Sequence, residues 1–179
     1  MTRAAEIDWS PRWYTQAQVY EGKGIKEYPG ALKNNPIILR WANQLGLKWI
    51  TNDEVPWCAL FVGACLRDVG IKAPASAAAK SYLNWGRELT FPHRGAIAVL
   101  DRKNAAGKSI GGHVAFVAGR RSDGKLMLLG GNQSNKVCIV PVDPARVISY
   151  RWPDGVMEQP GVLPLFKMSG DMVLSVNEA

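Results

Sequence analysis

The chain has 179 residues, a formal net charge of +7, 47% hydrophobic residues and 21% charged residues. These values indicate a single globular domain with a real hydrophobic core. No apolar run reaches the ~18 residues that a membrane span needs. The segment MTRAAEIDWSPRW lacks the apolar stretch and cleavage site of a secretory signal. A chain like this that acts outside the cytoplasm would need a pore, a virion or a secretion machine to carry it.

The positive charge is unevenly distributed. The segment from Pro153 onward contains one Lys and four acidic residues, so the first 152 residues carry a net charge of about +10. Such a surface should attract a polyanion, namely nucleic acid, acidic lipid or an anionic cell wall. No Lys/Arg block exceeds two residues and no nucleic-acid module is recognisable, so we expect no nucleic-acid partner.

The first half of the chain is expected to be helical. Residues 34–47 have an Asn cap, Pro36 in the first turn and apolar residues at helical spacing. Residues 54–69 form a second expected helix closed by Gly70, and residues 75–86 a third closed by Gly86.

After Pro92 the hydrophobic period changes from 3.6 to 2, which predicts strands. Asp-Gly in RRSDGK indicates a hairpin turn, and the Gly-rich stretch 102–112 is expected to be a loop. Helices followed by strands with tight turns predict an α+β fold in which the helices pack on a five- to six-stranded antiparallel sheet. The expected domain spans 1–152, and residues 153–179 are expected to form an extended appendage. The strand candidates are 95–101, 113–119, 125–130, 136–142 and 146–152.

Three cysteines without paired spacing, Cys58, Cys65 and Cys138, do not suggest a disulfide framework. With two histidines and no C-x-x-C, we expect neither a metal nor another cofactor. Cys58 falls in the first turn of the helix predicted for 54–69, where unpaired N–H groups and the helix dipole favour a thiolate. From this position alone, a nucleophile and a core thiol are equally good interpretations. Cys65, in an apolar stripe, and Cys138, in VCIV, are expected to be core residues.

A nucleophilic thiol needs a base and a group that orients the base. His113 opens a predicted strand after a glycine pair, whereas His93 lies in a turn and is expected to be exposed. If the strands 113–119 and 125–130 form a hairpin, Asn132 comes close to His113. Gln133 is the next candidate for the orienting role and otherwise a substrate-binding candidate.

The segments DEVPWCALFVGACLRDVG, GAIAVLDR, GGHVAFVAG and LLGGNQSNKV resemble the cysteine, histidine-dependent amidohydrolase/peptidase (CHAP) and NlpC-like superfamily. The resemblance runs from about residue 15 to residue 152 and is strongest to cell-wall hydrolases of phages and bacteria. It implies a papain-like fold and cleavage of an amide bond in peptidoglycan. By motif, Cys58 matches the nucleophile, His113 the base and Asn132 the orienting residue.

Two further residues near Cys58 have open roles. Asp53 is expected either to cap the helix or to bind an ammonium group of a stem peptide. Trp57 is expected to be a core residue or a wall of the substrate groove rather than a sugar platform.

The resemblance implies a monomeric peptidoglycan endopeptidase, acting in the periplasm or cell wall after delivery by a holin, a virion or a secretion system. Such proteins can have a delivery or immunity partner. The alternatives are an N-acetylmuramoyl-L-alanine amidase of the same fold, a deamidase or acyltransferase toxin acting on proteins, and a non-enzymatic wall-binding module.

Overall fold

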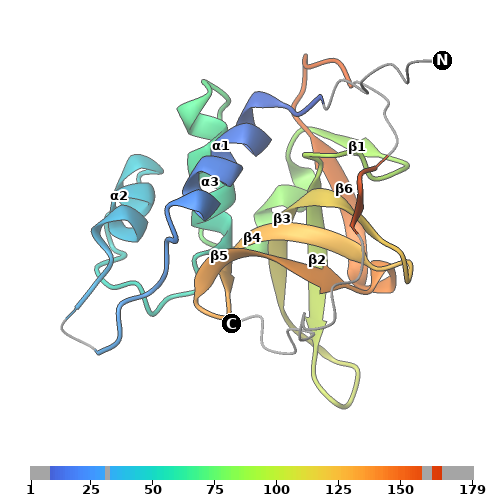
Figure 1. Cartoon of the computed structure of the whole chain (residues 1–179). Coiled ribbons are helices and arrows are strands. Elements are labelled where there is room, and N and C mark those ends of the chain that lie inside the picture. The colour runs from blue at the N-terminus through green and yellow to red at the C-terminus, as the bar shows by residue number, and fades with distance from the viewer. Residues whose placement is uncertain (1–8, 31–32, 159–162, 167–179) are drawn as a thin grey trace.

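Three helices lie to one side of an antiparallel sheet in the computed structural model, which describes residues 9–30, 33–158 and 163–166 (Figure 1). The α+β class predicted from the sequence is confirmed. The helices are α1 (Arg12–Gly22), α2 (Pro36–Gln44) and α3 (Cys58–Asp68), with short 3-10 helices η1 (Ala79–Asn84) and η2 (Pro144–Arg146). None of the described helices is long and apolar enough to cross a membrane.

Within the described residues the sheet has seven strands, one or two more than predicted. Six follow the order β1-β6-β2-β3-β4-β5 in antiparallel pairs, and β7 pairs in parallel with β3. The strands are β1 (Arg87–Leu89), β2 (Ile97–Lys103), β3 (Ser109–Arg121), β4 (Leu126–Gln133), β5 (Lys136–Val142), β6 (Val147–Trp152) and β7 (Leu165–Phe166).

Two local predictions are corrected, and one helix had no predicted bounds. The expected helix 75–86 is only the 3-10 turn η1, followed directly by β1. The expected loop 102–112 is mostly hairpin, because β2 and β3 continue pairing as far as Lys103 and Ser109. Helix α1 is the one without predicted bounds; it has no side-chain N-cap and is held by its buried aromatic residues instead.

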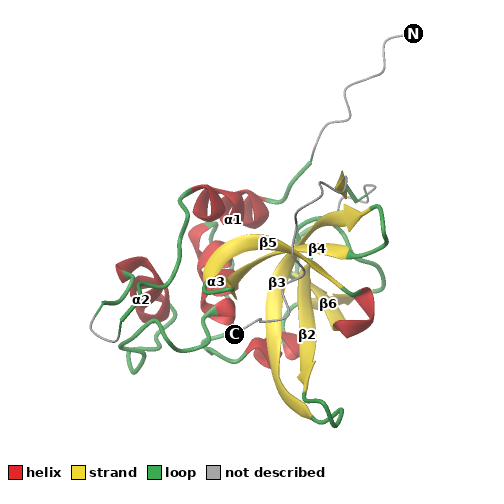
Figure 2. Ribbon diagram, turned by 60° about the horizontal axis from the view of Figure 1, so that its bottom comes forward, coloured by secondary structure: helices red, strands yellow, loops and turns green. Residues whose placement is uncertain are grey.

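Helix α3 is enclosed by other elements. It contacts α1 and α2 on one side and β3 and β4 on the other (Figure 2). Every residue from Cys58 to Leu66 is consequently buried. A helix surrounded in this way must be apolar all round, which explains the run CALFVGACL.

Part of the predicted appendage 153–179 packs on the sheet. Leu165 and Phe166 pair with Arg120 and Arg121. Gly119 allows this approach, because a Cβ there would lie 2.4 Å from the Pro164 carbonyl oxygen. Glu158 forms an ion pair with Arg87. Residues 159–162 and 167–179 of the predicted appendage lie outside the described residues.

Candidate active site

The site begins where α3 begins. Trp57 is the N-cap residue and gives no side-chain cap, so the first-turn N–H groups of α3 are open to another acceptor. The sulfur of Cys58, the first helical residue, takes a hydrogen bond from the backbone N–H of Ala59. The sequence thus places a sulfur at the positive end of a helix, where a thiolate is stabilised.

The sulfur also reaches a gap between two strands. Pairing of β3 with β4 ends at Phe116 and Leu129, whereas β3 stays paired with β2 as far as Ser109. Along β3, successive backbone N–H groups point alternately toward β2 and toward β4. The N–H of Val117 bonds to the carbonyl of Ala96 on the β2 side. Three residues earlier, the N–H of Val114 therefore points to the β4 side, where the gap lies. There it donates a hydrogen bond to the Cys58 sulfur.

His113 pairs with Cys58 through its side chain. Its Nε2 lies 3.0 Å from Oε1 of Gln133, so Nδ1 is the ring nitrogen that Gln133 does not engage. The structure thus places the side chains of Cys58 and His113 next to each other; their catalytic roles stay a prediction.

The orientation of the Gln133 amide decides the tautomer of His113. Its Nε2 group donates to the carbonyl of Cys138 at 2.6 Å and to that of Leu128 at 3.3 Å. Because both of these partners are acceptors, Oε1 must be the atom that faces the imidazole. His113 then carries its proton on Nε2, and the Nδ1 lone pair is available to the thiol of Cys58.

These contacts change the acidity of the thiol. Burial raises the pKa of Cys58, but the hydrogen bond and charge of His113 and the N–H groups of Val114 and Ala59 outweigh burial, so the pKa lies below its usual value. Cys58 keeps 3% exposure, whereas His113 and Gln133 have none. All three side chains are therefore buried in the structure.

The structure corrects the orienting role given to Asn132. Continuing the register of Phe116 with Leu129 would set Asn132 opposite His113. However, the β4–β5 register shifts between Gly130 and Gln133, and Asn132 has a left-handed φ of 57°. This breaks the side-chain alternation, and Gln133 rather than Asn132 reaches the ring. Asn132 is 2% exposed, and its Oδ1 has no hydrogen-bond partner among the described residues.

Asp53 and Gln133 are buried and hydrogen-bonded to other residues of the chain. Asp53 is buried, and its Oδ2 accepts from the backbone N–H groups of Asn35 at 2.8 Å and Tyr28 at 3.2 Å. It does not cap α3. The capping role expected for Asp53 is therefore wrong: the carboxylate ties the loop before α3 to the start of α2. Binding of an ammonium group by Asp53 stays a prediction, and the burial of the side chain does not favour it. Gln133 is fully buried and committed to His113.

Trp57 is a core residue and not a groove wall. It is fully buried, and its indole Nε1 donates to Oε1 of Glu27 at 2.7 Å. Its ring also covers Gly131, where a Cβ would lie 2.6 Å from Trp57 Cζ3. No sequence signal pointed to Glu27.

The remaining thiols have no catalytic surroundings. Cys65 is fully buried, and burial raises its pKa well above the usual value. Cys138 is half-buried, and its pKa is also raised by burial. His93, expected to be exposed, instead bonds to Glu158 at 3.0 Å and packs on Trp152. Within the part of the chain that the structure describes, no group of three or more His, Cys, Asp or Glu could hold a metal ion.

One comparison with known proteins found a match. Residues 50–132 match the family model described as the CHAP domain. This range includes Cys58 and His113, but neither Gln133 nor Glu27. The searches of curated proteins and of solved structures gave no match.

Proposed function

The chain carries a CHAP domain of the CHAP/NlpC-like cysteine peptidase family, and on that premise we propose that it is a peptidoglycan endopeptidase with Cys58 as nucleophile. CHAP domains are generally peptidoglycan-cleaving hydrolases that act on the cell wall. The observation that carries the proposal is the connected set of Cys58, His113 and Gln133 at the start of α3.

The first half of the reaction is acyl transfer. Nδ1 of His113 takes the thiol proton, and the Cys58 sulfur attacks the amide carbonyl carbon while the carbonyl π electrons move to oxygen. The backbone N–H of Cys58, at the positive end of α3, is the donor that we assign to this oxyanion. When the oxyanion collapses, the C–N bond breaks, and Nδ1–H of His113 protonates the leaving amine. The product is a thioester on Cys58.

Hydrolysis of the thioester completes the cycle. A water gives its proton to Nδ1 of His113 while its oxygen attacks the thioester carbon. The C–S bond then breaks, which releases a carboxylic acid and restores the thiolate–imidazolium pair. Throughout, Gln133 keeps the ring in position. Because an amide carries no charge, it raises the basicity of the imidazole less than a carboxylate would.

A basic hairpin supports an anionic polymer as the substrate. The hairpin of β2 and β3 projects beyond the rest of the sheet (Figure 2). It carries Arg102 and Lys103 at the end of β2 and Lys108 in the connecting loop. It continues directly into the strand that supplies His113. We infer that these charges hold the enzyme, as a monomer delivered by a partner system, against the wall.

The test is a digest of purified sacculi with the wild type, Cys58→Ala and Cys65→Ala, followed by mass spectrometry of new amino termini. Cys58→Ala should give no product, whereas Cys65→Ala, which removes the other thiol of α3, should retain activity. New termini within stem peptides or cross-bridges identify an endopeptidase, and release of the stem from muramic acid identifies an amidase. Equal product from wild type and Cys58→Ala would exclude Cys58 as nucleophile, and ammonia release from a protein glutamine without wall cleavage would indicate a deamidase.

A further inference from the structure

The segment that follows α1 extends the sheet beside the active site. The N–H of Val137 bonds to the carbonyl of Ile25 at 2.8 Å, and the N–H of Glu27 bonds to that of Asn135 at 2.9 Å. Asn135 belongs to the turn that directly follows Gln133. The backbone of Glu27 is thereby fixed to the strand end that orients His113.

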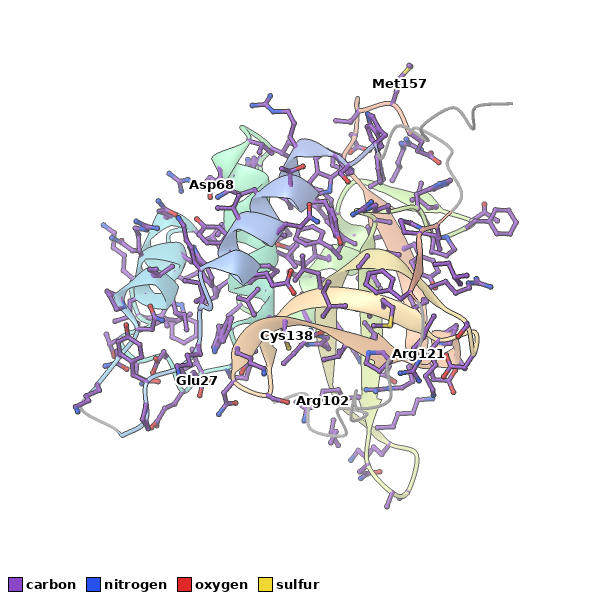
Figure 3. The ribbon with its side chains drawn as sticks, in the orientation of Figure 1. Glu27, Asp68, Arg102, Arg121, Cys138 and Met157 are labelled. Atoms are coloured by element: carbon purple, nitrogen blue, oxygen red, sulfur yellow. The ribbon has the colours of Figure 1, made fainter. Side chains whose placement is uncertain are left out.

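The side chain of Glu27 points to the other half of the site. Its Oε1 accepts from Nε1 of Trp57 at 2.7 Å, and Trp57 directly precedes Cys58. Figure 3 shows Glu27 on the segment between α1 and α2, near the end of the molecule at which α3 begins. One residue therefore connects, through one backbone and one side-chain hydrogen bond, the Gln133 turn and the Cys58 helix.

This contact is not a surface ion pair. The pKa of Glu27 is raised, first by burial and then by the nearby carboxylates of Asp53 and Glu54, while the hydrogen bond from Trp57 opposes the shift. Among the described residues, no Lys or Arg forms an ion pair with Glu27. Without Glu27, the indole N–H of Trp57, a residue with no exposed surface, would lose its hydrogen-bond partner at the edge of the core.

Trp57 contacts both halves of the site, the end of β4 and the start of α3. Its ring lies on Gly131, two residues before Gln133, and also packs on Trp41 with ring centroids 6.1 Å apart. A shift of the ring would move the start of α3 relative to the end of β4. A displacement of about 1 Å is enough to cost a reaction roughly a hundredfold.

We propose that Glu27 is a positioning residue: it fixes Trp57, and thereby the start of α3, so that the Cys58 sulfur stays within hydrogen-bond reach of His113. The consequence for hydrolysis rests on the proposed function, but the consequence for the reactivity of the Cys58 thiol does not. Glu27 lies outside the segment that matches the CHAP family model.

The experiment compares Glu27→Ala, Glu27→Gln and Trp57→Phe in the full chain. Alkylation of Cys58 by iodoacetamide is followed across pH by peptide mass spectrometry, and kcat and KM are measured on a soluble muropeptide. Glu27→Ala should move the alkylation midpoint to higher pH and lower kcat about tenfold, with a smaller change in KM. Glu27→Gln keeps an acceptor and should restore both. Trp57→Phe keeps a ring without the N–H and should behave like Glu27→Ala, and the double variant should be no worse than either single variant.

Glu54→Ala is the matched control, since it removes a neighbouring exposed carboxylate whose side chain forms no hydrogen bond or ion pair among the described residues. It should leave the alkylation profile and kcat unchanged. A folded Glu27→Ala or Trp57→Phe with the wild-type alkylation profile would overturn the proposal. So would a rise in KM shared by Glu27→Gln and Glu54→Ala, because that result assigns the carboxylates to substrate binding. An inactive wild type with a shifted Glu27→Ala alkylation profile would refute the hydrolase function alone.

Discussion

The first turn and the middle of α3 each contain a buried cysteine, and the pKa values of the two thiols are shifted in opposite directions. Cys58 and Cys65 lie seven residues apart on one buried helix, and burial raises the pKa of both thiols. At Cys65 nothing opposes burial effectively, whereas at Cys58 one imidazole and two backbone N–H groups reverse the shift. The difference shows that burial does not by itself make a thiol inert: the polar groups that share its cavity determine its acidity.

The two regions differ because their neighbours differ. The middle of α3 lies in the hydrophobic core, where Cys65 is fully buried. The first turn faces the place where β3 leaves β4 and exposes the N–H of Val114. An unpaired stretch inside the sheet, which would be costly if left unsatisfied, here binds the nucleophile.

The largest expected effect is a difference between these thiols in alkylation. Reaction requires the thiolate, whose fraction rises as pH passes the pKa. Because the pKa of Cys58 is lowered, its reaction with iodoacetamide should reach half its maximal rate at lower pH than that of free cysteine. At neutral pH Cys58 should react at least about a hundredfold faster than Cys65. Site-resolved mass spectrometry of the intact fold measures both rates, and equal rates would remove the contrast on which the proposed chemistry depends.

The next largest effect should follow from removing the group that orients His113. Gln133→Leu leaves Nε2 of His113 without its acceptor and should lower kcat/KM roughly tenfold to a hundredfold. Gln133→Glu should also fail, because a carboxylate would bring a second acceptor against the carbonyls of Leu128 and Cys138.

Asn132→Gly is the matched variant for this prediction. It removes the neighbouring amide and suits the left-handed backbone at that position, so it should keep most of the activity. A loss with Asn132→Gly that equals the loss with Gln133→Leu would return the orienting role to Asn132.

The sequence was sufficient for the class of fold, because helix and strand periods are local signals. Helix position alone left Cys58 open between a nucleophile and a core thiol. Only the resemblance to CHAP proteins gave Cys58 and His113 their catalytic roles, which stay predictions. Lys136–Val142 was predicted with its observed bounds. The orienting residue depended on the register shift after Gly130 and the left-handed conformation of Asn132. Neither can be read from a Gly-Gly-Asn-Gln string, which suits several turns. Glu27 was missed for a similar reason: only tertiary packing brings it to Trp57.

The smallest expected effect comes from the contact between α3 and β4. Gly131 lies against α3, and a Cβ there would be 2.5 Å from Phe61 Cβ and 2.6 Å from Trp57 Cζ3. Neither buried ring has room to move aside, so Gly131→Ala should push α3 away from β4. We expect a loss of about 1–3 kcal/mol of unfolding free energy and a severalfold lower rate of Cys58 alkylation.

Gly22→Ala adds the same methyl group at the end of α1, where no atom lies within 4 Å, and should be neutral or slightly stabilising. Chemical denaturation and the alkylation assay measure both variants. If Gly131→Ala is as stable and as reactive as Gly22→Ala, close packing between α3 and β4 is not what holds the sulfur beside the imidazole.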